Sequence, residues 1–195
     1  MVSTKIIAEL REKTGAGMML CKEALEQTNG DMEKAVEVLR KKGAASASKR
    51  VSKSVKAGIV YAYLHMDTVG AMVEVNCETD FVARTDDFKE LAKDIAMQVA
   101  AMNPIYVRRE DVPPEVLEKE KAIYKDEVAK SGKPANIVEK IVEGKLEKFY
   151  KDFCLVDQLF IKDDKIQIKD LVAQKIGKIG ENIVIKRFAR FKIGE

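Results

Sequence analysis

The sequence has no tryptophan, one histidine and three cysteines among its 195 residues. Cys21, Cys77 and Cys154 are far apart in the chain, so we expect neither a disulfide framework nor a zinc site built on Cys and His. A nucleophilic pair of Cys77 and His65 is compatible with the spacing. Both residues, however, fall in strand-like runs, where a packed thiol and a surface imidazole are far more common. We therefore predict no catalytic residue, metal ligand or cofactor, and no enzyme.

Long apolar runs are missing too. No segment approaches the roughly 18 apolar residues that a membrane span needs, and Met1-Val2-Ser3-Thr4-Lys5 lacks the apolar stretch of a secretory signal. We therefore expect a soluble, cytoplasmic protein that does not bind membranes. No glycine-rich phosphate loop follows a strand-like run, so we expect no direct nucleotide binding.

The charges lack a strong excess of one sign. With 35 Lys and Arg against 32 Asp and Glu, the formal net charge is only +3. A protein that coats nucleic acid depends mainly on neutralising phosphates, and this near-balance argues against that class. We therefore predict no nucleic-acid partner.

The first 45 residues have the hydrophobic period of three short helices. The second is predicted from about Met18 to Asn29, and the third is expected to end at Gly43. The residues that bound these helices are a cap at Ser3 or Thr4, the break Thr14-Gly15-Ala16-Gly17, the stop at Gly30 and the cap at Asp31.

The second helix has more apolar side chains than one small core accepts. Its inward face is satisfied by Cys21, Ala24, Leu25 and Thr28, yet Met18, Met19 and Leu20 add three large groups in the first turn. Either the preceding loop covers the extra methionine, or the methionines form an adaptable patch for a partner helix. We favour the patch, with Arg11 as its polar rim.

A basic stretch of small residues, Arg40 to Lys56, follows without any acidic group. It is typical of a solvated tether, although an electrostatic contact with an acidic partner is the alternative. We predict a helical domain at 1–45, a basic linker at 46–57 and a core at 58–195. A module that binds RNA or the ribosome through this linker is the alternative function.

The core changes to a period of two. Residues 59–65 and 71–79 predict a hairpin with Cys77 on its buried face, and Asp86 or Asp87 is expected to cap an amphipathic helix. Further segments predict helices from Glu115, from Pro134 and at 171–176, and strands within 155–168 and at 182–193. This order predicts the α+β class, with an antiparallel sheet packed against helices.

Five segments resemble the bacterial elongation factor Ts family, the nucleotide exchange factors of elongation factor Tu. They occur in family order across nearly the whole chain, which makes coincidence very unlikely. The segments are Thr14–Leu25 with Asn29-Gly30-Asp31, Glu74–Val82, Ser131–Pro134, Ile141–Lys145 and Ile179–Ile183.

The resemblance implies a ubiquitin-associated-like N-terminal domain and a core that bears the loop Thr79-Asp80-Phe81-Val82. It implies that this loop promotes GDP release by disturbing the Mg²⁺ and phosphate site of elongation factor Tu. Phe81 is then a wedge between helices of the GTPase, and Asp80 fixes the loop and disturbs the surroundings of Mg²⁺. The alternative is that Phe81 packs on its own helix through Val82 and Phe88.

The chain departs from the long form of this family, which has a doubled core and a helical-hairpin insertion, because 195 residues leave room for only one core unit. It is similar to the short form, in which two chains pair. We expect Ile183, Ile185, Ala189, Phe191 and Ile193 to share one face of the last strand and to favour a homodimer. We expect that dimer to be non-covalent, with a Cys154 link as the alternative. The family commonly has Pro within Gln158-Leu159-Phe160, which leaves that turn open.

Overall fold

The computed structural model describes residues 2–129 and 135–195. It is a mixture of helices and antiparallel sheet, which confirms the α+β class. The chain divides into two compact units. The first contains Met1–Tyr61, Glu74–Lys93 and Asp170–Ile185, and the second contains Ala62–Val73, Asp94–Lys169 and Lys186–Glu195.

The N-terminal bundle of the first unit consists of α1 (Thr4–Thr14), α2 (Met18–Gln27) and α3 (Met32–Arg50). Ser3 caps α1, Asp31 caps α3, and Gly15 and Gly30 have the left-handed φ values of 68° and 86° that end a helix. The sequence predicted each of these boundaries. The bundle core is the set of buried side chains Ile7, Leu10, Cys21, Ala24, Leu25 and Ala35.

Helix α3 does not end at Gly43, as the sequence predicted, but continues to Arg50. Alanine, lysine and arginine favour helix in this stretch, so one glycine does not stop it. Gly43 instead faces α8 (Ile168–Ile179), where a Cβ atom on Gly177 would lie 3.2 Å from the Gly43 Cα. The start of the predicted linker is therefore helical, and only residues 51–56 connect α3 to the first strand.

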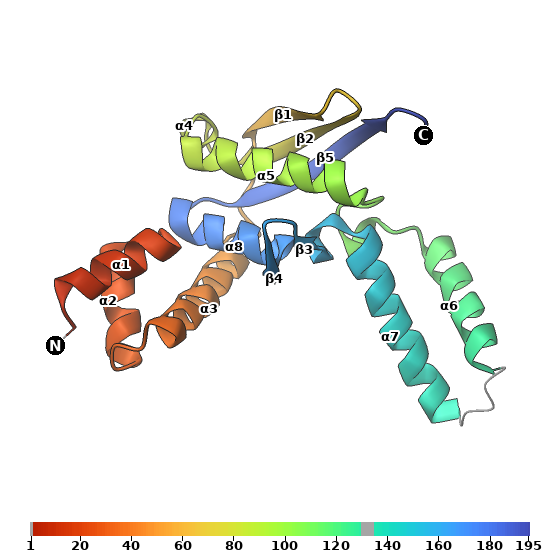
Figure 1. The fold of residues 1–195 in the computed structure, drawn as a ribbon, viewed down its shortest axis with the longest axis horizontal. Helices are drawn as coiled ribbons and strands as arrows, with labels where there is room; N and C mark the ends of the chain where they lie inside the picture. The colour runs from red at the N-terminus through yellow and green to blue at the C-terminus, as the bar shows by residue number, and fades with distance from the viewer. Residues whose placement is uncertain (1, 130–134) are drawn as a thin grey trace. The chain divides into compact units, whose positions relative to one another are not determined.

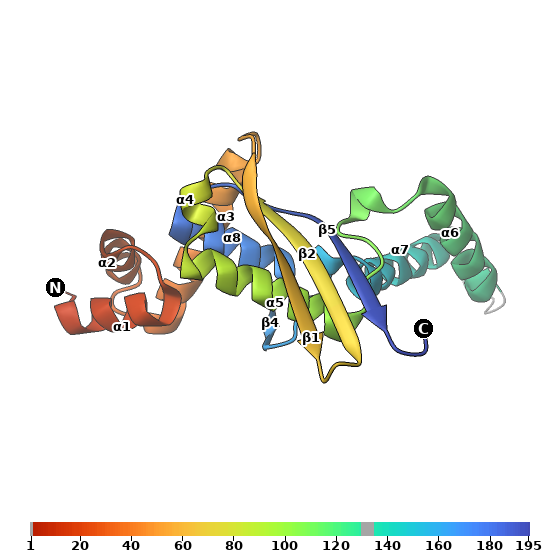
Figure 2. The same ribbon diagram turned by 90° about the horizontal axis from the view of Figure 1, so that it is seen from above.

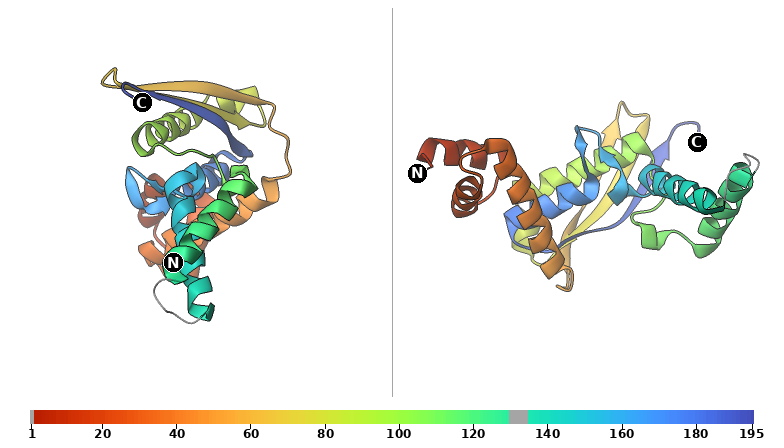
Figure 3. Two further views of the ribbon diagram at one scale, coloured as in Figure 1. Left: turned by 90° about the vertical axis from the view of Figure 1, so that its right-hand side faces the viewer. Right: turned by 90° about the horizontal axis from the view of Figure 1, so that it is seen from below.

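The sheet has three strands in the order β1 (Ala57–His65), β2 (Val69–Cys77) and β5 (Ile183–Lys192), as Figure 2 shows. Helix α5 (Asp86–Met102) runs along one face of the sheet in Figures 1 and 3. The inward residues of β2 alternate as predicted, and Ala71, Val73, Val75 and Cys77 are all buried.

The cap of α5 differs from the prediction. The Phe88 N–H donates to Thr85 Oγ1 at 3.4 Å, so the cap is Thr85 rather than Asp86 or Asp87. Asp87 lies inside the first turn, where a carboxylate interacts favourably with the helix dipole.

Strand β5 changes which of its alternate side chains face inward. Ile183 and Ile185 are buried, whereas Arg190 turns inward further along and its Nε donates to the Ala100 carbonyl at 3.1 Å. The five side chains expected to share one apolar face therefore differ in exposure, since Ala189, Phe191 and Ile193 are exposed whereas Ile183 and Ile185 are buried.

The second unit contains α6 (Pro114–Ala129) and α7 (Ala135–Phe153), which lie side by side as a helical hairpin in Figures 1 and 2. The sequence predicted helices from Glu115 and from Pro134, and these two helices are confirmed. The predicted helix start at Pro134, and the segment Ser131–Pro134, lie outside the described residues. A short 3-10 turn, Arg109–Asp111, precedes the hairpin.

A small two-stranded sheet follows, with β3 (Leu159–Phe160) antiparallel to β4 (Asp163–Gln167) after the 3-10 turn Leu155–Asp157. The buried Gln158 fixes the entry to β3, since its Nε2 donates to the Asp152 carbonyl and its Oε1 accepts from Gln98. The pairing register shifts between Leu159 and Phe160. This irregular pairing is the turn that the sequence left open.

Candidate functional site

The segment Thr79 to Val82 is the start of a one-turn helix rather than a loop. Helix α4 (Asp80–Ala83) begins after Thr79, whose Oγ1 accepts from the Val82 N–H at 3.4 Å. The Phe81 side chain is 81% exposed, whereas Phe88 is fully buried. Phe81 therefore does not pack into its own domain, and the alternative in which it does is wrong.

Asp80 is also at the surface of α4. Its Oδ2 accepts from Arg84 Nη2 at 3.0 Å, and both side chains are largely exposed. An exposed ion pair of this kind contributes only about 0.2–1 kcal/mol. A partner that offers a better contact can therefore separate Asp80 from Arg84 at little cost.

Two carboxylates hold the base of α4. Glu181 accepts from the backbone N–H groups of Glu78 and Thr79 and from the Thr79 hydroxyl. In return Glu78 accepts from the Asn182 N–H at 2.7 Å. Sequence reasoning missed both roles, although Glu78 and Glu181 lie in two segments that carried the family resemblance.

Cys77 ends β2, two residues before Thr79 in the chain. It is fully buried, and its Sγ donates to the Thr79 carbonyl at 3.1 Å. Burial, and then the nearby Glu181 carboxylate, raise the pKa of the thiol to about 11, so it stays protonated at neutral pH. His65 is at the turn end of the β1–β2 hairpin, where its Nδ1 lies 3.1 Å from the Tyr63 hydroxyl, and Cys77 ends β2 away from that turn. The two residues do not form a pair.

The methionine patch of the N-terminal bundle is open to solvent. Met18 is 45% exposed and Met19 is 67% exposed, both in the first turn of α2. The alternative in which the preceding loop covers them is therefore wrong. Arg11 is exposed in the last turn of α1, and only Gly15-Ala16-Gly17 separates α1 from α2. These residues and Thr79–Val82 belong to different elements.

Part of the basic stretch is engaged within the chain. Lys42 Nζ lies 2.8 Å from Glu23 Oε2, and Arg50 Nη1 lies 3.3 Å from Glu78 Oε1. These pairs reduce the positive charge that the stretch offers to a phosphate backbone. The alternative function as an RNA-binding linker is correspondingly less well supported.

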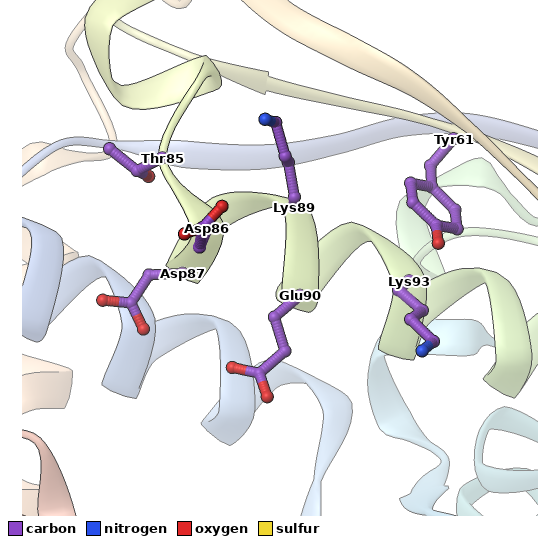
Figure 4. Close-up of a pocket in the computed structure, with 7 residues that line it drawn as sticks. All are labelled: Tyr61, Thr85, Asp86, Asp87, Lys89, Glu90 and Lys93. Carbon is purple, nitrogen blue, oxygen red and sulfur yellow. The ribbon is translucent and has the colours of Figure 1, made fainter.

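Figure 4 shows a surface pocket beside the start of α5. Two of its acidic residues are paired with lysines, because Lys178 Nζ lies 2.6 Å from Asp87 and Lys175 Nζ lies 3.1 Å from Glu90. The hydrogen bond from Lys178 holds the pKa of Asp87 below its usual value. The remaining lining residues are Tyr61, Thr85, Asp86, Lys89 and Lys93. This mixed lining points to no particular ligand.

Within residues 2–129 and 135–195, no group of three or more His, Cys, Asp or Glu side chains is arranged to hold a metal ion. No helix in the same part of the chain is long and apolar enough to cross a membrane.

The sequence matches the family model described as "Elongation factor TS" over residues 7–195. The chain belongs to the elongation factor Ts family. It is 60% identical to "Elongation factor Ts" of Thermotoga maritima over 195 residues, which is all of this chain and 97% of that protein. It is 57% identical to that of Thermodesulfovibrio yellowstonii over all of this chain and 97% of the relative, and 59% identical to that of Carboxydothermus hydrogenoformans over all of this chain and 90% of the relative.

Membership of the elongation factor Ts family confirms the resemblance and assigns the chain a role in translation elongation. The chain spans nearly the full length of these relatives.

Proposed function

We propose that this chain binds elongation factor Tu in the cytoplasm and promotes release of its GDP, so that GTP can bind. The observation that carries the proposal is the exposed Phe81 on α4, whose base is held by two carboxylates. Rigidly placed, exposed aromatic side chains are frequent anchors of protein interfaces. The factor acts by binding, with no covalent step and no cofactor.

The mechanism follows from what holds a guanine nucleotide in a GTPase. Backbone N–H groups cradle the phosphates, and Mg²⁺ bridges phosphate oxygens to protein ligands. Phe81 inserts as a wedge between helices near this site, and the Asp80 carboxylate disturbs the surroundings of the metal. Because coupling between two ligands is reciprocal, a bound nucleotide must expel the factor as the factor expels the nucleotide.

The direct test is the rate at which GDP leaves elongation factor Tu with and without this chain. We expect the rate to rise with the concentration of the chain until it saturates. An unchanged rate at saturating concentration overturns the proposal.

We propose that the helical domain at residues 1–45 supplies the grip on the GTPase. Its methionine patch, formed by Met18 and Met19 with Arg11 beside it, is exposed and adaptable. Flexible methionines suit a partner helix laid across them. Binding and nucleotide release are then functions of different elements of this chain.

We propose that two chains pair into a homodimer through the second unit. Strand β5 is an edge of the sheet, and Phe191 near its end is 75% exposed. Leu64 and Met72 are both exposed. They lie on the same face of the hairpin, because Met72 is two residues from Gly70 in β2 and a Cβ atom on Gly70 would lie 3.1 Å from Leu64 Cδ2. Two-fold pairing buries such an apolar surface twice with one patch.

Sedimentation equilibrium under reducing conditions tests the dimer. We expect a mass near twice the 21.8 kDa of one chain at micromolar concentration, and a Phe191→Lys variant that sediments as a monomer. The control is Ile123→Lys, which places the same charge on α6. A wild-type mass near 21.8 kDa refutes the dimer. A Cys154 link is disfavoured because that thiol is fully buried and unpaired.

A further inference from the structure

The carboxylate of Glu181 gathers three donors at the base of α4. Its Oε2 accepts from the N–H groups of Glu78 at 3.2 Å and Thr79 at 3.0 Å, and its Oε1 accepts from the Thr79 hydroxyl at 2.7 Å. Hydrogen bonds to an ionised acceptor are roughly twice as strong as neutral ones. Glu181 is therefore a strong tie between the end of α8 and the start of α4.

The Thr79 hydroxyl connects Glu181 to the backbone of α4. Its only proton goes to Glu181, so its lone pairs are left to accept from the Val82 N–H. Helix α4 has four residues, and so short a helix is not stable by itself. The orientation of α4, and of Phe81 on it, therefore depends on how its first residue is held.

Glu181 is itself held in place. Gly180 has a φ of 83° and its N–H donates to the Ile176 carbonyl at 2.8 Å, which ends α8 and turns the chain toward Thr79. The next residue, Asn182, donates its N–H to Glu78, which also accepts from Arg50. In each of the segments around residues 78 and 181, a glutamate carboxylate thus accepts hydrogen bonds from the backbone of the other segment.

We propose that Glu181 is a positioning residue for nucleotide exchange, which holds Thr79 and thereby keeps Phe81 in the orientation that the GTPase meets. This inference rests on the proposed function of α4. Without Glu181 the short helix samples several orientations, and only the competent fraction of complexes releases GDP. The methionine patch still binds the GTPase, so affinity changes less than the release rate.

The first test compares Glu181→Ala and Glu181→Gln with wild type in stimulated GDP release. We expect the maximal rate to fall about tenfold for alanine, as for other losses of hydrogen bonds to a charged group, while the half-saturating concentration changes by less than about threefold. Glu181→Gln keeps one acceptor oxygen in place of two, so we expect its maximal rate to lie between those of Glu181→Ala and wild type. The control is Glu118→Gln, whose carboxylate pairs only with Lys121 of its own helix among the ion pairs of the described residues.

The second test is a double-mutant cycle with Phe81→Ala. If Glu181 acts through Phe81, then Glu181→Ala slows release by less than about twofold in the Phe81→Ala background. If Glu181→Ala slows release by the same factor with and without Phe81→Ala, Glu181 acts independently of Phe81, and the inference is overturned. An unchanged maximal rate in Glu181→Ala also overturns it, whereas a wild-type chain that fails to stimulate release overturns the proposed function as well.

Hydrogen exchange in the free protein separates positioning from general destabilisation. We expect the Val82 amide to exchange faster in Glu181→Ala, since its acceptor Thr79 is released, while the Ile95 amide within α5 is unchanged. Equal acceleration at both amides means general destabilisation and contradicts a positioning role.

Discussion

Replacing Phe81 with alanine is expected to slow stimulated GDP release from elongation factor Tu by a factor of about ten or more. Loss of an aromatic anchor from an interface costs about 2 kcal/mol or more, and each 1.4 kcal/mol corresponds to about tenfold in rate. The effect falls on the exchange reaction alone, because Phe81 is 81% exposed in the free chain and stabilises its fold little. The measurement is the maximal release rate at saturating factor.

Two controls make this result specific. The thermal unfolding curve of Phe81→Ala should match that of wild type. Ile105→Ala, which removes another exposed apolar side chain, should leave the release rate unchanged. A Phe81→Ala chain that folds normally and releases GDP as fast as wild type refutes the wedge.

Replacing both Met18 and Met19 with serine is expected to weaken association with elongation factor Tu by about tenfold or more, mostly through faster dissociation. The two side chains are exposed in the free protein, so their loss leaves the bundle core of Leu10, Cys21 and Leu25 intact. The maximal release rate at saturating factor should stay within about twofold of wild type, because α4 is unaltered.

Substitution in the intact chain is a sharper test than removal of residues 1–45. Such a deletion cuts within α3, whose second half continues to Arg50 and its pair with Glu78. Met102→Ser is the matched control, since Met102 is exposed to a similar degree as Met18 but lies at the end of α5. If the double variant binds elongation factor Tu as tightly as wild type, the methionine patch does not contribute to this association.

The parts of the fold that the sequence predicted are those set by local chemistry. Ser3 and Asp31 cap helices by their own side chains, Gly15 and Gly30 end them through left-handed backbone, and β2 alternates buried and exposed residues over its whole length. These features depend on neighbours only a few residues away.

The parts that the sequence did not predict depend on distant neighbours. Gly43 lies against α8 at Gly177, more than a hundred residues further along the chain. Strand β5 changes its inward side where Arg190 reaches the end of α5. No local pattern indicates either contact.

The same division holds at the site. Thr79, Asp80, Phe81 and Val82 were predicted because the sequence around them resembles a family segment, and the structure adds that Phe81 is exposed. The support from Glu181 was not predicted, since it lies about a hundred residues from Thr79 and binds mainly backbone atoms. Backbone groups carry no sequence signal.

The central claim is that this chain speeds GDP release, and the most direct measurement uses elongation factor Tu loaded with labelled GDP. The GTPase of Thermotoga maritima is a suitable partner, because the elongation factor Ts of that organism is 60% identical to this chain. Release is followed after excess unlabelled GDP is added, with Mg²⁺ present and increasing amounts of the chain. We predict a rate that rises at least about tenfold and saturates, with a smaller relative increase when a chelator has already removed Mg²⁺. A rate that stays at the intrinsic value at every concentration of the folded chain contradicts the claim.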